Sequence, residues 1–119
     1  SALLALLHDE PGGEAVRDLL EGAAISSVNW TEVLQKALER QTEIEGLRED
    51  LEALGLRVLP FSAAQAEQTA RFRAQTRAWG LSLGDRACLA LAADLKVPAV
   101  TADRVWSEIP LGVEIRVVR

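Results

Sequence analysis

The chain of 119 residues has one cysteine, one histidine and no long apolar run. The single cysteine, Cys88, excludes a disulfide within the chain and fits a reducing cytoplasm. Because Cys88 lies among alanine and leucine residues, we expect it to pack in the core. The only histidine, His8, precedes the loop-like sequence DEPGG, and we expect it to be a surface residue.

No apolar run approaches the ~20 residues that a membrane-spanning helix needs. The opening SALLALL is also too short for a signal peptide, so we expect a cytoplasmic protein without a membrane anchor. The glycine patterns of dinucleotide-binding and phosphate-binding loops are missing, which argues against an enzyme that uses a nucleotide cofactor. With 49% hydrophobic and 26% charged residues, the composition is that of a globular protein, and we expect one domain over residues 1–119.

A net charge of −5 argues against nucleic acid as a partner, but the negative charge is concentrated in one segment. Residues 39–52 hold six acidic residues and two arginines, so the rest of the chain has a net charge of only −1. Outside this segment, Arg71, Arg73 and Arg77 lie on one predicted helix, where Arg73 and Arg77 share a face. A solvated helix face or a surface for phosphate groups would explain them.

Strand and helix patterns alternate along the chain. Apolar and β-branched runs predict strands at residues 23–28, 56–60, 98–102 and 113–118. Apolar spacing predicts helices at residues 2–7, 14–20, from 29 onward, 43–54, 63–79 and 82–95. The helix that begins at residue 29 should turn Val33, Leu34, Ala37 and Leu38 inward, and the helix over 82–95 is apolar on both sides and should lie deep in the fold. The alternation predicts an α/β fold with a mostly parallel central sheet between helices.

Three acidic residues lie at predicted helix entrances. Glu32 follows the first predicted strand, Asp103 follows the third, and Asp85 is in the first turn of the apolar helix. Ligands of open parallel sheets bind beyond the carboxyl ends of the strands. Acids that converge there destabilise the fold unless they are neutralised, and a divalent cation with oxygen ligands would neutralise them.

Each acid also has a purely structural explanation. The pairs Asn29 with Glu32 and Ser82 with Asp85 have the spacing of a capping box. Asp103 would stabilise any helix N-terminus through its negative charge. Spacing alone therefore leaves both helix caps and a metal site open.

At these residues the sequence resembles PIN domains, and in particular the VapC-type ribonuclease toxins of bacterial toxin–antitoxin pairs. The similar segments cover nearly the whole chain: SALLALLHDEPGGE, ISSVNWTEVL, SLGDRACLALAADLKVPAVTADRVW and VEIRVVR. The most specific part is SLGDRACLALA followed by TAD. The resemblance implies a three-layer α/β/α fold whose acids bind Mg²⁺ or Mn²⁺ and hydrolyse single-stranded RNA.

The resemblance also implies roles for individual residues. Glu32, Asp85 and Asp103 match the second, third and fourth acids of the family, which bind the metal and carry the catalysis. Ser1 and Thr101 match hydroxyl groups that support the site. The first acid of the family should stand two residues before Ser1 at the end of a central strand, so we expect that strand and acid upstream of residue 1.

Other residues have two possible roles. Arg86 and Arg104 would contact RNA phosphate or pair with a neighbouring acid. Trp30 would stack on a base, although a core position is favoured. Trp79 and Trp106 are assigned to packing or to a subunit contact.

A VapC-type toxin implies an RNA substrate, a VapB-type antitoxin that covers the acids, and a homodimer. Leu3, Leu4 and Leu7 would suit such protein contacts or the core. In this reading, a metal-activated water cleaves the RNA and leaves a 5′-phosphate. Two alternatives remain: a non-catalytic PIN-like module that binds RNA or protein, and a metal-dependent DNA nuclease or phosphatase on a similar sheet.

Overall fold

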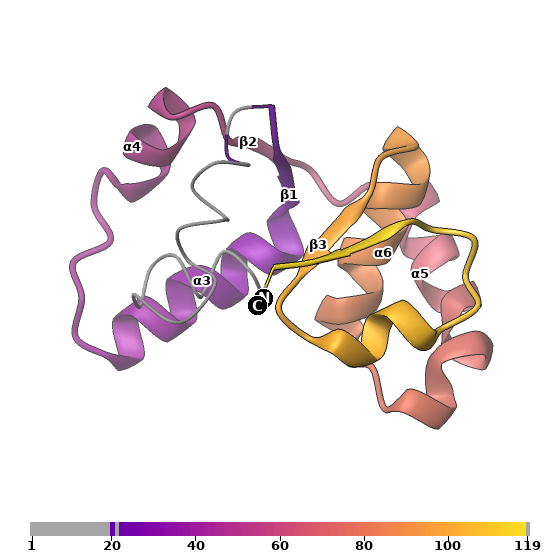
Figure 1. Cartoon of the computed structure of the whole chain (residues 1–119). Helices are drawn as coiled ribbons and strands as arrows, with labels where there is room; N and C mark the ends of the chain where they lie inside the picture. Colours follow the sequence, from indigo (N-terminus) through magenta and orange to yellow (C-terminus); the bar gives the residue numbers. More distant parts are fainter. Residues whose placement is uncertain (1–19, 21, 119) are drawn as a thin grey trace.

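The structure is a computed structural model that describes residue 20 and residues 22–118 (Figure 1). The predicted helix at residues 2–7 and nearly all of the one at 14–20 lie outside the described residues. The same holds for residues that the sequence singled out near the start of the chain: Ser1, Leu3, Leu4, Leu7 and His8. No helix in the described ranges is long and apolar enough to span a bilayer.

The first half of the described chain contains strand β1 (Ala24–Ser26), helix α3 (Ser27–Glu39), helix α4 (Leu47–Ala53) and strand β2 (Arg57–Leu59). β1 and β2 are parallel, with Ile25 opposite Val58. Apolar side chains from these elements and from the residues next to them form one buried cluster: Leu20, Ile25, Trp30, Val33, Leu51 and Leu56. Trp30 is 8% exposed, so its predicted core position is confirmed.

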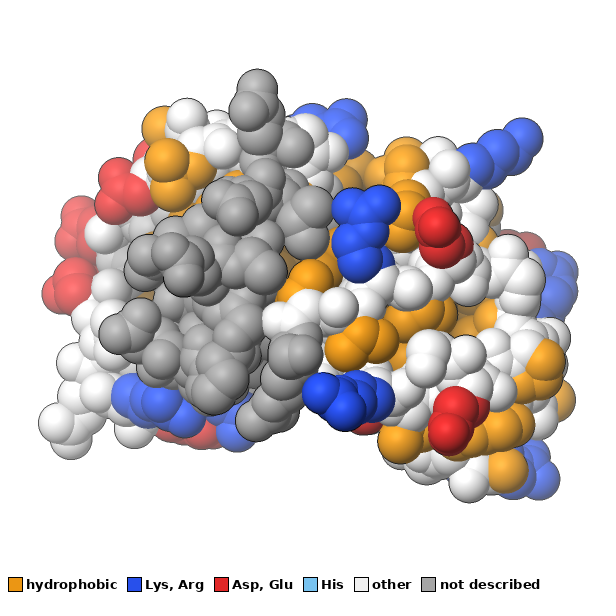
Figure 2. Space-filling model, viewed as in Figure 1, with side chains coloured by type: hydrophobic (Ala, Val, Ile, Leu, Met, Phe, Trp, Pro, Cys, Tyr) orange, Lys and Arg blue, Asp and Glu red, His pale blue; other side chains and the backbone are white. Residues whose placement is uncertain are grey.

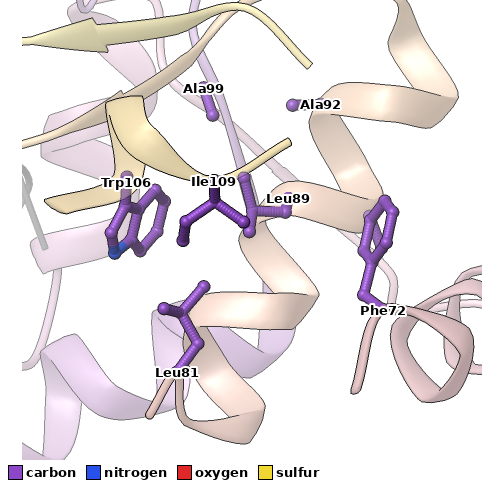
Figure 3. Close-up of a cluster of buried hydrophobic side chains, with 8 residues drawn as sticks. Phe72, Leu81, Leu89, Ala92, Ala99, Trp106 and Ile109 are labelled. Carbon is purple, nitrogen blue, oxygen red and sulfur yellow. The ribbon is translucent and has the colours of Figure 1, made fainter. Parts of the chain in front are cut away.

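The second half contains helix α5 (Ala63–Thr76), the 3₁₀ helix η1 (Arg77–Trp79), helix α6 (Leu83–Leu95), strand β3 (Ala99–Thr101), the 3₁₀ helix η2 (Arg104–Glu108) and strand β4 (Ile115–Val117). β3 and β4 are parallel, with Val100 opposite Arg116. A second cluster packs between α6, η2 and α5 (Figure 3): Phe72, Leu81, Leu89, Ala90, Ala92, Ala99, Trp106 and Ile109. Packing was correctly predicted for Trp106, whereas Trp79 on η1 is 36% exposed and packs only in part.

The four predicted strands are present and parallel, as expected for an α/β fold, but they do not form one sheet. The described strands make two separate two-stranded sheets, β1 with β2 and β3 with β4. Helix α6 packs against α5, α3, β1 and β3. The two sheets are therefore joined through a helix, and the predicted deep position of the apolar helix is confirmed.

Helix α3 begins at Ser27, two residues earlier than predicted, because Ser26 is its N-cap. Ser26 has extended backbone angles (φ −66°, ψ 145°), and its Oγ accepts a hydrogen bond from the Val28 N–H at 3.2 Å. The predicted capping box of Asn29 and Glu32 is therefore wrong. Both side chains lie inside the helix and are available for contacts elsewhere.

Helix α4 is shorter than predicted and follows an acid-rich segment. The predicted helix over 43–54 is reduced to Leu47–Ala53, because Gly46 adopts a left-handed conformation (φ 81°) at its N-cap and the acid-rich residues before it are irregular. Figure 2 shows acidic side chains gathered at this edge of the molecule.

Leu38, predicted to face inward from α3, is instead 57% exposed, whereas Val33 and Ala37 are buried.

Candidate active site

Asp85 is held at the N-terminus of α6 by a capping box with Ser82. The Asp85 Oδ2 accepts a hydrogen bond from the Ser82 N–H at 3.0 Å, and the Asp85 N–H donates to the Ser82 Oγ at 3.1 Å. This predicted cap is confirmed. It fixes the carboxylate where the helix dipole favours negative charge, and its Oδ1 accepts no hydrogen bond from the described residues. The cap therefore orients Asp85 without consuming both of its oxygens.

Helix α3 brings Glu32 to the same place. The Glu32 carboxylate lies directly against Gly84, the residue before Asp85. A Cβ atom built on Gly84 would be 2.7 Å from both the Cδ and the Oε2 of Glu32, closer than real Cβ contacts. The Glu32 carboxylate thus lies against the first turn of α6, the turn that carries Asp85. A shared metal site of these two acids stays a prediction.

Asn29 connects these residues. It is 7% exposed, and its Nδ2 donates to the Glu32 Oε1 at 3.0 Å and to the Gly84 carbonyl oxygen at 2.8 Å. Both bonds need the amide nitrogen, so the orientation of the amide is determined. Its Oδ1 is buried and has no hydrogen-bond partner in the described part of the chain, which ordinarily costs about 1–3 kcal/mol.

Cys88 lies one turn along α6 from Asp85 and experiences both carboxylates. Burial, followed by the negative charge of Asp85 and a smaller effect of Glu32, raises the pKa of the Cys88 thiol to about 11. The thiol is therefore protonated near neutral pH and packs against the apolar cluster, as predicted. The negative charges of Asp85 and Glu32 raise this pKa in the same direction as burial does.

Asp103 follows β3 and is held by hydrogen bonds between side chains and the backbone of its own turn. Thr101 is 3% exposed, and its Oγ1 accepts the Asp103 N–H at 3.0 Å. The Asp103 Oδ1 accepts the Val105 N–H at 3.0 Å and caps η2. Thr101 thus positions the turn that carries Asp103. Within the described ranges, no three acidic, cysteine or histidine side chains lie close enough to hold one metal ion, so Asp103 does not join Glu32 and Asp85 in such a group.

The two arginines beside the acids differ in their contacts. The Arg86 Nη1 donates to the Thr69 carbonyl oxygen at 3.0 Å and links α6 to α5. The ion pairs of the described residues involve other side chains, so none of the described acids pairs with Arg86 or Arg104. Arg104 is exposed at the start of η2. Contact with phosphate stays a prediction for both arginines.

The oxygens at this site suit a hard divalent cation. Mg²⁺ is commonly held by one or two carboxylates together with waters. Glu32 and Asp85 each keep one oxygen, Oε2 and Oδ1, that accepts no hydrogen bond from the described residues. A buried amide oxygen without such a partner, Asn29 Oδ1, lies on the residue that bonds Glu32 and the Gly84 carbonyl oxygen. The donor set therefore fits Mg²⁺ or Mn²⁺.

Sequence reasoning missed Asn29 and Gly84 as parts of the site. The spacing of Asn29 and Glu32 predicts a helix cap, whereas the N-cap in the structure is Ser26. The sequence signal for Gly84 is a glycine inside the first turn of a helix, which lowers helix stability and indicates a close contact.

A family model described as the PIN domain matches residues 1–111 of the chain. The chain belongs to the PIN domain family. This PIN domain is similar in fold to a toxin–antitoxin complex from Klebsiella pneumoniae, with 23% identity, a TM-score of 0.72, and coverage of 96% of this chain and 94% of that one. It is also similar to VapBC2 from Rickettsia felis bound to a promoter DNA fragment, with 20% identity, a TM-score of 0.69, and coverage of 99% and 93%. No curated protein sequence matches it.

Proposed function

We propose that this PIN domain is a VapC-type toxin that cleaves single-stranded RNA with Mg²⁺ or Mn²⁺. The observation that carries the proposal is the position of the Glu32 carboxylate against Gly84, the residue before the capped Asp85, in a family whose members are generally nucleases. Two solved structures of similar fold are toxin–antitoxin assemblies, which supports the toxin class.

In this proposal the acids hold the metal through oxygen atoms. Glu32 and Asp85 are ligands, directly or through water, and Asp103 after β3 acts through a water. When bound, the metal lowers the pKa of a water molecule and stabilises charge on the phosphate. Ser1 is expected to support the site but lies outside the described residues.

The protein supplies orientation. The Ser82 cap fixes Asp85, so this carboxylate need not be ordered when the metal and substrate bind. The Thr101 hydroxyl fixes the turn of Asp103. Arg104 is exposed beside Asp103, which supports a contact with phosphate, whereas Arg86 already bonds the Thr69 carbonyl oxygen and would have to keep or exchange that bond.

The proposed partner is an antitoxin that covers the acids. Leu83 is 59% exposed two residues before Asp85, and Val105 is 40% exposed two residues after Asp103. Exposed apolar side chains beside charged groups suit a protein partner. We also propose a homodimer, for which the exposed Trp79 is a candidate contact.

The test is cleavage of an end-labelled single-stranded RNA by the full-length protein with Mg²⁺ or Mn²⁺, with and without EDTA. Asp85→Asn is the site variant, because asparagine retains an oxygen for the Ser82 N–H. Asp94→Asn, near the other end of α6, is the matched control. We expect metal-dependent cleavage by the wild type and by Asp94→Asn, and none by Asp85→Asn.

Two other outcomes identify the alternatives. No cleavage of a panel of RNAs by a folded protein would favour a non-catalytic module that binds RNA or protein. Equal cleavage of the deoxy version of the substrate would favour a DNA nuclease, because the 2′-hydroxyl distinguishes the two nucleic acids.

A further inference from the structure

Asn29 and Gly84 both lie against the Glu32 carboxylate, and each is a residue type that lowers stability at its position. Asn29 is a buried polar residue inside α3, and its Oδ1 has no partner in the described part of the chain. Gly84 is a glycine inside the first turn of α6, where alanine would stabilise the helix. Sequences that depart from the locally favourable residue often do so at functional sites.

Backbone conformation does not explain Gly84. Five described glycines have a positive φ, and Gly84 is not one of them. A side chain there would meet the Glu32 carboxylate, whose Cδ and Oε2 would each lie 2.7 Å from a Cβ atom, so this flexible end of Glu32 would have to move. Gly84 therefore leaves the space that Glu32 fills.

The buried position of Asn29 is explained by its hydrogen bonds to Glu32 and Gly84. One amide group donates both to the Glu32 Oε1 and to the Gly84 carbonyl oxygen. It thus fixes one oxygen of Glu32 relative to the backbone of the helix turn that carries Asp85. The second oxygen, Oε2, stays without a described partner.

We infer that Asn29 and Gly84 are positioning residues that set the Glu32 carboxylate beside Asp85 for metal binding. Asn29 fixes the direction of the carboxylate, and Gly84 permits its close approach. This inference rests on the proposed metal-dependent function, and it assigns to both residues an effect on metal affinity that acts only through Glu32.

Gln65 provides a matched control within the same protein. It is also 7% exposed, its Nε2 donates to the Asp94 Oδ2 of α6 at 3.2 Å, and its Oε1 is buried without a described partner. Gln65→Ala therefore removes a buried amide and an amide–carboxylate bond, as Asn29→Ala does, at a distance from Glu32 and Asp85.

The experiment measures Mn²⁺ affinity by calorimetry on the full-length protein without RNA, and thermal unfolding of each variant. Residues that orient metal ligands typically change metal affinity about 10- to 100-fold when replaced. We expect Asn29→Ala and Gly84→Ala each to weaken Mn²⁺ binding by about this factor, and Gln65→Ala to bind as the wild type does.

Two further readouts separate positioning from general stability. Gly84→Ala should unfold at the same temperature as the wild type or higher, because alanine favours the helix, while its Mn²⁺ affinity falls. In a Glu32→Gln background, adding Asn29→Ala or Gly84→Ala should weaken binding no further. If Asn29→Ala does not fold, Gly84→Ala alone decides the question.

Wild-type affinity in both Gly84→Ala and a folded Asn29→Ala would overturn the inference, as would an equal loss in Gln65→Ala. If the wild type still binds Mn²⁺ and cleaves RNA, the proposed function survives that result. A wild type that binds no Mn²⁺ overturns both.

Discussion

The two ends of α6 carry the same kind of contact with different surroundings. At the N-terminal end, the Asn29 amide donates to Glu32, and near the C-terminal end the Gln65 amide donates to Asp94. Both amides are buried to the same extent, and each has an oxygen without a described partner. Burial and hydrogen bonding alone therefore do not distinguish a functional contact from a packing contact.

The difference lies in the charge and space around each pair. At the N-terminal end two acids meet, the helix dipole favours them, and a glycine makes room for one of them. At the C-terminal end a single exposed acid, Asp94, lies where the dipole disfavours negative charge, and Gln65 offsets this. A candidate site is thus marked by converging charge together with the space left for it.

The largest expected effect is on catalysis. Glu32→Gln and Asp94→Asn each replace a carboxylate by an amide that can still accept the existing hydrogen bond. A metal supplies several kcal/mol of transition-state stabilisation, so Glu32→Gln should lower the RNA cleavage rate by on the order of 10³-fold. Asp94→Asn should leave it unchanged. RNA cleavage rates at a fixed Mg²⁺ concentration test this. An equal loss of rate in Glu32→Gln and Asp94→Asn would show that the two ends of α6 do not differ in function.

A smaller effect is expected from the serine caps of the neighbouring helices. The Ser82 Oγ caps α6, and the Ser62 Oγ caps α5 by accepting the Gln65 N–H at 3.1 Å. Ser82→Ala and Ser62→Ala should each lower the free energy of unfolding by about 1 kcal/mol. Only Ser82→Ala should also slow cleavage, because it loosens Asp85. Denaturant unfolding and cleavage rates of both variants measure this, and unchanged activity in Ser82→Ala would contradict it.

The smallest effect concerns the pH dependence of stability. The pKa of Cys88 is about 11 in the folded protein and about 9 when it is unperturbed. Because the folded state favours the protonated thiol, the contribution of Cys88 to stability is complete below about pH 9 and is lost as the pH rises to about 11.

Thiol modification followed against pH measures this pKa. Asp85→Asn should lower the pKa of Cys88 because it removes a negative charge, whereas Asp94→Asn should not. A pKa near 9 in the folded wild type would contradict the burial of this thiol among the acids.

The sequence predicted the features that depend on local pattern. The four strands, the depth of α6 and the capping box of Ser82 with Asp85 follow from apolar runs and residue spacing, and the structure contains them. The resemblance to PIN domains was confirmed by the family match. The roles of Glu32, Asp85 and Asp103 as metal ligands stay predictions.

Features that depend on tertiary contact were not predicted. Ser26 and Asn29 are both good N-caps, and the choice between them depends on where β1 ends. The contact of Asn29 with Gly84 joins residues on different helices, which spacing along one helix does not reveal. The separation of the described strands into two sheets is likewise a matter of which strands pair, which the pattern within each strand does not reveal.

Helix α6 touches elements of both sheets, and this has a consequence for how the protein opens. Separating either half from α6 would expose leucine and alanine side chains that are now buried on two sides. Local opening is therefore expected at the periphery, around α4 and the segment before it, while amide hydrogens in the middle of α6 exchange with solvent only when the whole domain unfolds. The Asp85 carboxylate at the start of this helix is thus carried by what we expect to be the slowest-exchanging segment of the protein.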